Sequence, residues 1–180
     1  MEQKKLRVLA LVGMLAAVGY VLQLFEFPLL PAAPFLKFDF GDVAVFMAGS
    51  ILGPAAMVLT AVVKGILWAL IGHGADGWVG ACMNTVTVIA FALPVAFLSR
   101  SRRGWVKVCA VVLGTLAMTT VMVAMNLIVD PWYFKMPVAA VKAMMIPAII
   151  PFNLLRGALN GTASVLVLLA LQRTRMFRPV

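Results

Sequence analysis

Long apolar runs recur along this chain, and they constrain its fold more than any other feature. A transmembrane helix needs about 20 predominantly apolar residues, and 64% of the 180 residues are hydrophobic while only 12% are charged. Soluble domains carry about 25% charged residues. The sequence therefore predicts an all-α membrane protein with one integral-membrane domain over residues 1–180.

Six apolar segments are predicted to be transmembrane helices. The first follows Lys4, Lys5 and Arg7 and is longer than the roughly 7–15 apolar residues of a signal peptide, so it is interpreted as an uncleaved span. The second is short and ends at the turn signal Gly53–Pro54, so it crosses only if it is tilted or begins in the preceding loop. An interfacial helix from residue 137 is expected before the sixth. The predicted ranges are 6–25, 42–53, 54–72, 79–98, 106–129 and 147–172.

The basic residues predict the orientation. With a cytoplasmic N-terminus, ten lysines and arginines fall on the inside and three on the outside, as the positive-inside rule requires. Both termini are therefore predicted to be cytoplasmic. Topology also explains the net charge of +9 better than nucleic-acid binding does. The inside set is Lys4, Lys5, Arg7, Arg100, Arg102, Arg103, Lys107, Arg173, Arg175 and Arg178. The outer segments carry every acidic residue except Glu2, namely Glu26, Asp39, Asp42, Asp76 and Asp130.

The outer loop between the first two helices, from Glu26 to Asp42, contains three prolines and four phenylalanines. Prolines stiffen the backbone, and the phenylalanines favour an apolar contact. We expect a structured lid over the outer end of the bundle. An aromatic belt at the membrane interface is the alternative.

Arg156 and Asn153 lie in the last apolar segment, three residues apart, and so share a face of a helix. An arginine at the bilayer centre costs roughly 2.5–3.5 kcal/mol on insertion scales, so such residues face a cavity or a partner. Asn84 and Asn126 lie in the outer halves of two other predicted helices. Three amides and a guanidinium suit a planar ligand rich in heteroatoms. Interhelical hydrogen bonding of about 0.6 kcal/mol per contact is the alternative.

Two intramembrane features have several interpretations. Lys64 is interpreted as snorkelling, as pairing with an outer carboxylate such as Asp76, or as lining the pocket. Gly13 and Ala17 form a small-xxx-small pattern on the first helix, which serves either packing within the chain or docking to a partner. His73 is interpreted as an ordinary loop residue.

Several motifs are absent from the sequence. There is no P-loop motif, so ATP hydrolysis would come from another subunit. A single histidine and no C-x-x-C pair argue against a zinc site. No nucleophile has an evident base, and the membrane carboxylates that proton-coupled carriers use are not expected. The chain is therefore predicted not to be an enzyme and to carry no metal.

The whole chain resembles the substrate-binding S-components of energy-coupling-factor (ECF) vitamin transporters, and most of all the riboflavin-specific members. Four passages carry the resemblance over about residues 6–172. They are the loop Glu26–Asp42, Val63–Gly65, Met83–Asn84 with Phe91–Pro94, and Pro151–Gly157.

The resemblance implies six helices and a flavin held near the outer face, as a transported ligand and not as a cofactor. It implies that Asn84, Asn126, Asn153 and Arg156 contact the ligand, where the family commonly has lysine instead of Arg156. The loop residues Ala32, Ala33, Phe35 and Lys37 would close over it.

The same resemblance implies a multi-pass protein of a bacterial cell membrane. Its partners would be a transmembrane coupling protein, docked at Gly13 and Ala17, and two ATP-binding-cassette ATPases. The predicted function is riboflavin uptake. The alternatives are another vitamin, a flavin analogue such as FMN, a queuosine-like base, and an intramembrane enzyme acting on lipids.

Overall fold

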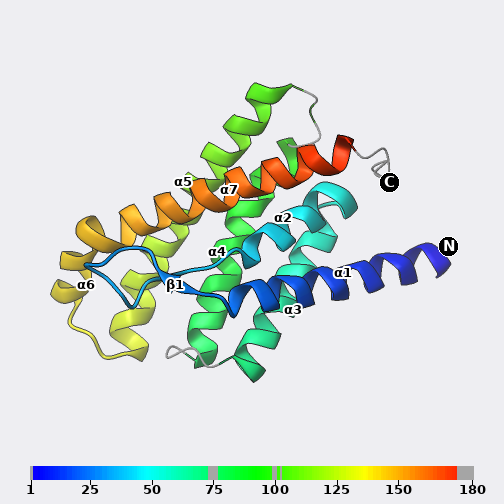
Figure 1. Cartoon of the computed structure of the whole chain (residues 1–180). Helices are drawn as coiled ribbons and strands as arrows, with labels where there is room; N and C mark the ends of the chain where they lie inside the picture. The colour runs from blue at the N-terminus through cyan, green and yellow to red at the C-terminus, as the bar shows by residue number, and fades with distance from the viewer. Residues whose placement is uncertain (1, 73–76, 99–100, 102, 174–180) are drawn as a thin grey trace.

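The computed structural model describes residues 2–72, 77–98, 101 and 103–173. His73 and Asp76 lie outside the described residues, as do the basic residues Arg100, Arg102, Arg175 and Arg178. The described chain is helical apart from one short hairpin (Figure 1). Its elements are α1 (Glu2–Gln23), β1 (Phe27–Pro28), β2 (Lys37–Phe38), α2 (Gly41–Leu52), α3 (Pro54–Ile71), α4 (Gly77–Leu98), α5 (Gly104–Tyr133), α6 (Val138–Met144), the π-helical turn η1 (Met145–Ile149) and α7 (Ile150–Arg173).

The predicted all-α membrane protein is confirmed. Within the described residues, five helical stretches are long and apolar enough to cross a membrane: α1, α3, α4, α5 and the continuous stretch Val138–Arg173. The sixth predicted helix, α2, has 12 residues and is only about 18 Å long at 1.5 Å per residue. A crossing by α2 therefore stays a prediction, as does the cytoplasmic location of both ends.

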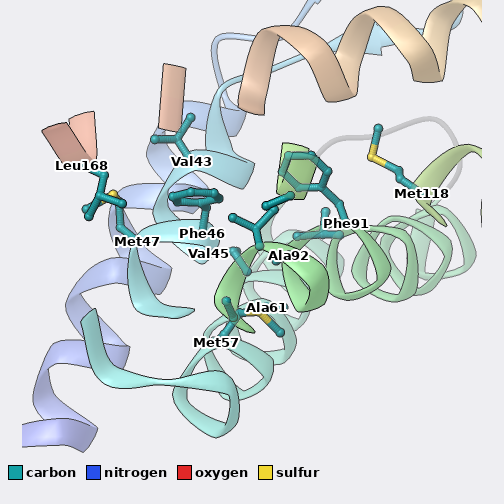
Figure 2. Close-up of a cluster of buried hydrophobic side chains, with 14 residues drawn as sticks. Val43, Val45, Phe46, Met47, Met57, Ala61, Phe91, Ala92, Met118 and Leu168 are labelled. Atoms are coloured by element: carbon teal, nitrogen blue, oxygen red, sulfur yellow. The ribbon is translucent and has the colours of Figure 1, made fainter. Parts of the chain in front are cut away.

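Helix α2 is the buried centre of the bundle. It contacts α1, α3, α4 and α7, and its residues from Gly41 to Gly49 are all buried. Figure 2 shows its side chains Val45 and Phe46 within a core that α3, α4, α5 and α7 complete. A helix that is apolar on every side belongs inside a bundle rather than against lipid. This burial holds the first turn of α2 in place.

Glycines allow α1 and α2 to approach closely at the start of α2. A Cβ atom on Gly41 would lie 2.5 Å from the backbone oxygen of Gly19. Any larger residue would push the two helices apart. The contact brings the C-terminal end of α1, with Gln23, beside the first turn of α2.

The last transmembrane stretch contains a π-helical turn that the sequence analysis did not predict. Pro147 lies within η1 and Pro151 lies in the first turn of α7. Each proline removes a backbone N–H donor from the regular helical ladder. Such π turns occur often at functional sites, and this one ends at Ile149, about one helical turn before Asn153.

The outer loop is structured, as predicted. Strands β1 and β2 pair antiparallel, with Phe27 opposite Phe38. Phe38 is fully buried and contacts the rings of Phe27 and Phe40 at centroid distances of 5.5 and 4.9 Å. This aromatic cluster fixes the base of the loop. The loop and α6 lie at one end of the bundle, opposite the N-terminal end of α1 and the C-terminal end of α7 (Figure 1).

Candidate ligand-binding site

A cavity of about 520 Å³ lies where the outer loop meets the helices. Ligand cavities in proteins typically measure about 300–1,000 Å³. Of the residues predicted to bind ligand, six line it: Phe35, Lys37, Asn84, Asn126, Asn153 and Arg156. The structure therefore brings together polar side chains from the loop, α4, α5 and α7.

Two predicted contacts do not line this cavity. Ala33 is buried, but it is not part of the cavity wall. Ala32 is exposed at the tip of the loop and also lies outside the wall. The chain between β1 and β2 turns at these alanines, while Phe35 and Lys37 follow on the strand side. A direct role for the two alanines would require the loop to close further.

Much of the rest of the wall is apolar, although Glu26, Asp39 and Asp130 also line it. Four methionines contribute from α4, α5, the following loop and α6, together with aromatic and branched side chains. Methionine thioethers are polarisable and interact favourably with ring edges. These residues are Met83, Met122, Met136, Met144, Ile149, Phe152, Trp68 and Phe134. The wall suits a ligand with a flat, partly apolar ring system.

Arg156 is buried and held on two sides. Its Nε and Nη2 atoms donate to Oδ2 of Asp42 at 3.1 and 2.7 Å. Nη2 also donates to Oδ1 of Asn84 at 2.5 Å. Hydrogen bonds from arginine to carboxylate are among the strongest in proteins. The guanidinium is thereby fixed at the cavity wall, which Asp42 itself does not line.

Lys64 pairs with a carboxylate, one of the three interpretations offered by the sequence. Its Nζ atom lies 2.9 Å from Oδ1 of Asp42, and both side chains are almost fully buried, at 2% and 1% exposure. Asp42 had been assigned to an outer segment, with no carboxylate expected inside the bundle. The structure corrects the second expectation, because the first turn of α2 carries Asp42 into the core.

Asp39 joins the loop to this cluster. Its Oδ1 accepts a hydrogen bond from the Gly41 amide at 2.7 Å, and its carbonyl accepts one from Nδ2 of Asn160 at 3.1 Å. Burial raises the pKa of the Asp39 carboxyl, and the positive charge of Lys64 opposes that rise. The base of the outer loop is thus bonded both to α2 and to α7.

Two buried amide oxygens at the cavity lack a hydrogen-bond partner among the described residues. They are Oδ1 of Asn153 and Oε1 of Gln23, and both residues line the cavity. The Nδ2 of Asn153 is occupied, because it donates to the Ile149 carbonyl at 2.8 Å. Buried polar atoms are nearly always hydrogen-bonded. These two oxygens are therefore candidate acceptors for a ligand that carries N–H or O–H donors.

Gln23 was not identified from the sequence. The only available signal is that it is an amide in an otherwise apolar first segment, close to the outer end. Asn126, which was identified, donates from Nδ2 to the Met122 carbonyl at 2.7 Å. This bond orients its amide along α5 at the cavity wall.

Gly13 and Ala17 lie on an exposed face of α1. A Cβ atom on Gly13 would meet nothing within 4 Å. The opposite face, with Val12 and Ala16, is buried against the bundle. Packing within the chain is therefore not the role of this small-residue pair, and docking to a partner stays a prediction. Among the described residues, no group of three His, Cys, Asp or Glu residues could hold a metal.

A helical membrane bundle with a ligand-sized cavity beneath a structured loop defines a substrate-binding membrane component. Residues 7–169 match the family described as "ECF transporter, substrate-specific component". The chain therefore belongs to this family, whose members are multi-pass membrane components of transporters and not enzymes.

Two relatives and one solved structure agree with this assignment. The chain is 31% identical to "Riboflavin transporter FmnP" of Bacillus subtilis, over 93% of each chain. It is 31% identical to "Riboflavin transporter RibU" of Streptococcus thermophilus, over 89% of this chain and 81% of that protein. A solved S component of a bacterial ECF transporter matches 96% of this chain and 99% of its own, with a TM-score of 0.80 and 26% identity.

Proposed function

We propose that this chain is the riboflavin-binding subunit of an ATP-driven ECF importer in a bacterial cell membrane. The cavity carries the proposal, because its size, its apolar wall and its two unpartnered amide oxygens suit one flavin. Two relatives named as riboflavin transporters support the choice of ligand. Riboflavin is here the transported ligand and not a cofactor.

The chemistry of a flavin matches the polar side of the cavity. The pyrimidine end of its ring presents one N–H donor between two carbonyl acceptors, and its ribityl chain presents hydroxyl groups. Oδ1 of Asn153 and Oε1 of Gln23 supply acceptors, and the guanidinium of Arg156 supplies a donor. The methionine and aromatic wall would contact the faces and the dimethyl end of the ring.

The outer loop is proposed to cover the bound ligand. Phe35 is 59% exposed although it lines the cavity, so its ring has apolar area to bury against a ligand. Lys37 forms an ion pair with Glu26 at 2.5 Å, which connects the loop to the end of α1. Closure would bring Ala32 and Ala33 nearer to the ligand.

Uptake against a gradient requires energy, and the chain contains no P-loop. The proposed partners are a transmembrane coupling protein and two ATP-binding-cassette ATPases. The exposed pair Gly13 and Ala17 offers a face where another helix can approach closely. We assign the coupling protein to this face of α1.

Titration of the purified protein with riboflavin, followed by tryptophan fluorescence, tests the ligand. Trp68 lines the cavity, so a bound flavin should quench its emission. We expect saturable quenching at nanomolar riboflavin and none with a vitamin that lacks a planar tricyclic ring. A folded protein that shows no quenching would contradict the proposal and direct the search to other vitamins, FMN or a queuosine-like base.

A further inference from the structure

We propose that Asp42 is a positioning residue for ligand recognition, which acts through Arg156 without touching the ligand. The inference rests on the proposed function, since it concerns how the same cavity recognises a flavin. Asp42 is 1% exposed and is not part of the cavity wall, whereas Arg156 is.

The two oxygens of Asp42 serve different cations. Oδ1 pairs with Lys64 of α3 at 2.9 Å, and Oδ2 pairs with Arg156 of α7 at 2.7 Å. A single carboxylate in the first turn of α2 thus connects three helices. Asn160 adds a long contact from Nδ2 to Oδ2 at 3.5 Å. Besides Arg156, the carboxylate of Asp42 is therefore held by Lys64 and Asn160, which do not belong to the cavity wall.

The bonds to Arg156 determine which of its atoms faces the ligand. Nε and Nη2 donate hydrogen bonds to Asp42, and Nη2 also donates one to Asn84. Nη1 donates to no acceptor in the described part of the chain. An arginine has five N–H donors in a rigid plane, so holding one edge of that plane fixes the direction of the donors on Nη1. The geometry points to Nη1 as the donor to a carbonyl oxygen of the ligand.

The unused donors of Arg156 also affect specificity. Lys64 and Arg156 share the carboxylate of Asp42, and Asp39 acts on both cations from nearby, but neither carboxyl accepts a hydrogen bond from Nη1. The guanidinium keeps an attraction for an oxygen that carries partial negative charge, such as a flavin carbonyl. A hydrocarbon or a hydrogen-bond donor at this position would leave Nη1 buried and unpaired, which is unfavourable.

A purely structural role is the competing explanation, because removing one partner of a buried ion pair destabilises a protein. A double-mutant cycle separates the two roles. The cycle is made in a Lys64→Met background, so that no variant retains both buried cations after Asp42 has lost its charge. Its four proteins are K64M, K64M/D42N, K64M/R156M and K64M/D42N/R156M. Riboflavin affinity and the thermal midpoint without ligand are measured for each.

If Asp42 positions Arg156, D42N should weaken riboflavin binding at least tenfold when Arg156 is present. It should change binding less than twofold when Arg156 has been replaced by methionine. Equal losses in both backgrounds, or no loss in either, would overturn the inference. Failure of the unmutated protein to bind riboflavin would instead refute the proposed function, so the two failures are distinguishable.

Asp42→Glu tests the positioning role of Asp42 without removing a charge. This variant replaces the cycle as the test if one of the four proteins does not fold. One added methylene keeps the cluster's charges but moves the carboxylate that holds the guanidinium. We expect at least threefold weaker binding of riboflavin by protein that elutes as a single folded species. Wild-type affinity in folded D42E would overturn the positioning role.

Discussion

Asn153 offers the sharpest test of the cavity. Its side chain is 1% exposed, and its Oδ1 has no partner among the described residues. If Oδ1 accepts a hydrogen bond from bound riboflavin, Asn153→Ala leaves a buried ligand donor unpaired. An unpaired buried donor costs about 1–3 kcal/mol, and each 1.4 kcal/mol is a factor of ten in affinity. We therefore expect binding weaker by about fivefold to 100-fold or more.

The assay is equilibrium titration with riboflavin by tryptophan quenching, with a second variant that separates volume from hydrogen bonding. Asn153→Leu keeps a side chain that branches at Cγ and fills the space, but it has no acceptor, so it should lose at least as much affinity as Asn153→Ala. Leu154→Ala is the matched control on the adjacent position of α7, because Leu154 is 39% exposed and does not line the cavity. Unchanged affinity in Asn153→Ala, with the control also unchanged, would refute the assigned role of Oδ1.

Three further predictions concern other parts of the molecule. Gly13→Trp should leave riboflavin affinity unchanged but abolish ATP-driven uptake in a reconstituted complex, because a large ring on the exposed face of α1 blocks the close approach of another helix. Retained uptake would exclude this face as the docking surface. Lys37→Met removes the half-exposed ion pair with Glu26. It should raise the riboflavin dissociation rate, measured by stopped flow, by up to about fivefold, since such pairs contribute about 0–1 kcal/mol. An unchanged rate would show that the pair does not hold the loop. Gly114→Ala places a Cβ 2.5 Å from the Phe91 backbone oxygen and should destabilise the contact between α5 and α4 by about 1–3 kcal/mol. The thermal midpoint of the protein should therefore fall, and an unchanged midpoint would contradict the prediction.

Much of the cavity was predictable from the sequence because polar residues are conspicuous within apolar segments. Asn84, Asn126, Asn153 and Arg156 each interrupt a long apolar run, and all four line the same cavity. Burying such groups in a bilayer is costly unless they face a partner or a cavity. Their convergence therefore follows from the composition around them.

The burial of Asp42 and Gln23 could not be predicted from an interruption of an apolar run. Each lies at the end of an apolar segment, where a polar residue normally faces water. Their burial depends on the close approach of α1 and α2 at Gly19 and Gly41, which is a tertiary contact. The sequence also left three interpretations of Lys64 open, and only the packing of α2 against α3 selected an ion pair with Asp42.

The structure of the outer loop was also predictable only in part. Its prolines and phenylalanines predicted an ordered segment, and Phe35 and Lys37 do reach the cavity. The pairing of Phe27 with Phe38 and the direction of the turn at Ala33 depend on contacts across ten residues. Composition alone therefore predicted that the loop is structured, but not which of its residues face the ligand.

The visible absorption spectrum of the detergent-purified protein tests the central claim most directly. After expression in medium containing riboflavin, the protein should be yellow, with the two absorption bands of an oxidised flavin. Denaturation should release riboflavin in about one equivalent, identified by mass. A colourless protein that stays folded and takes up no added riboflavin would contradict the account, and would leave the fold and the family with a different ligand.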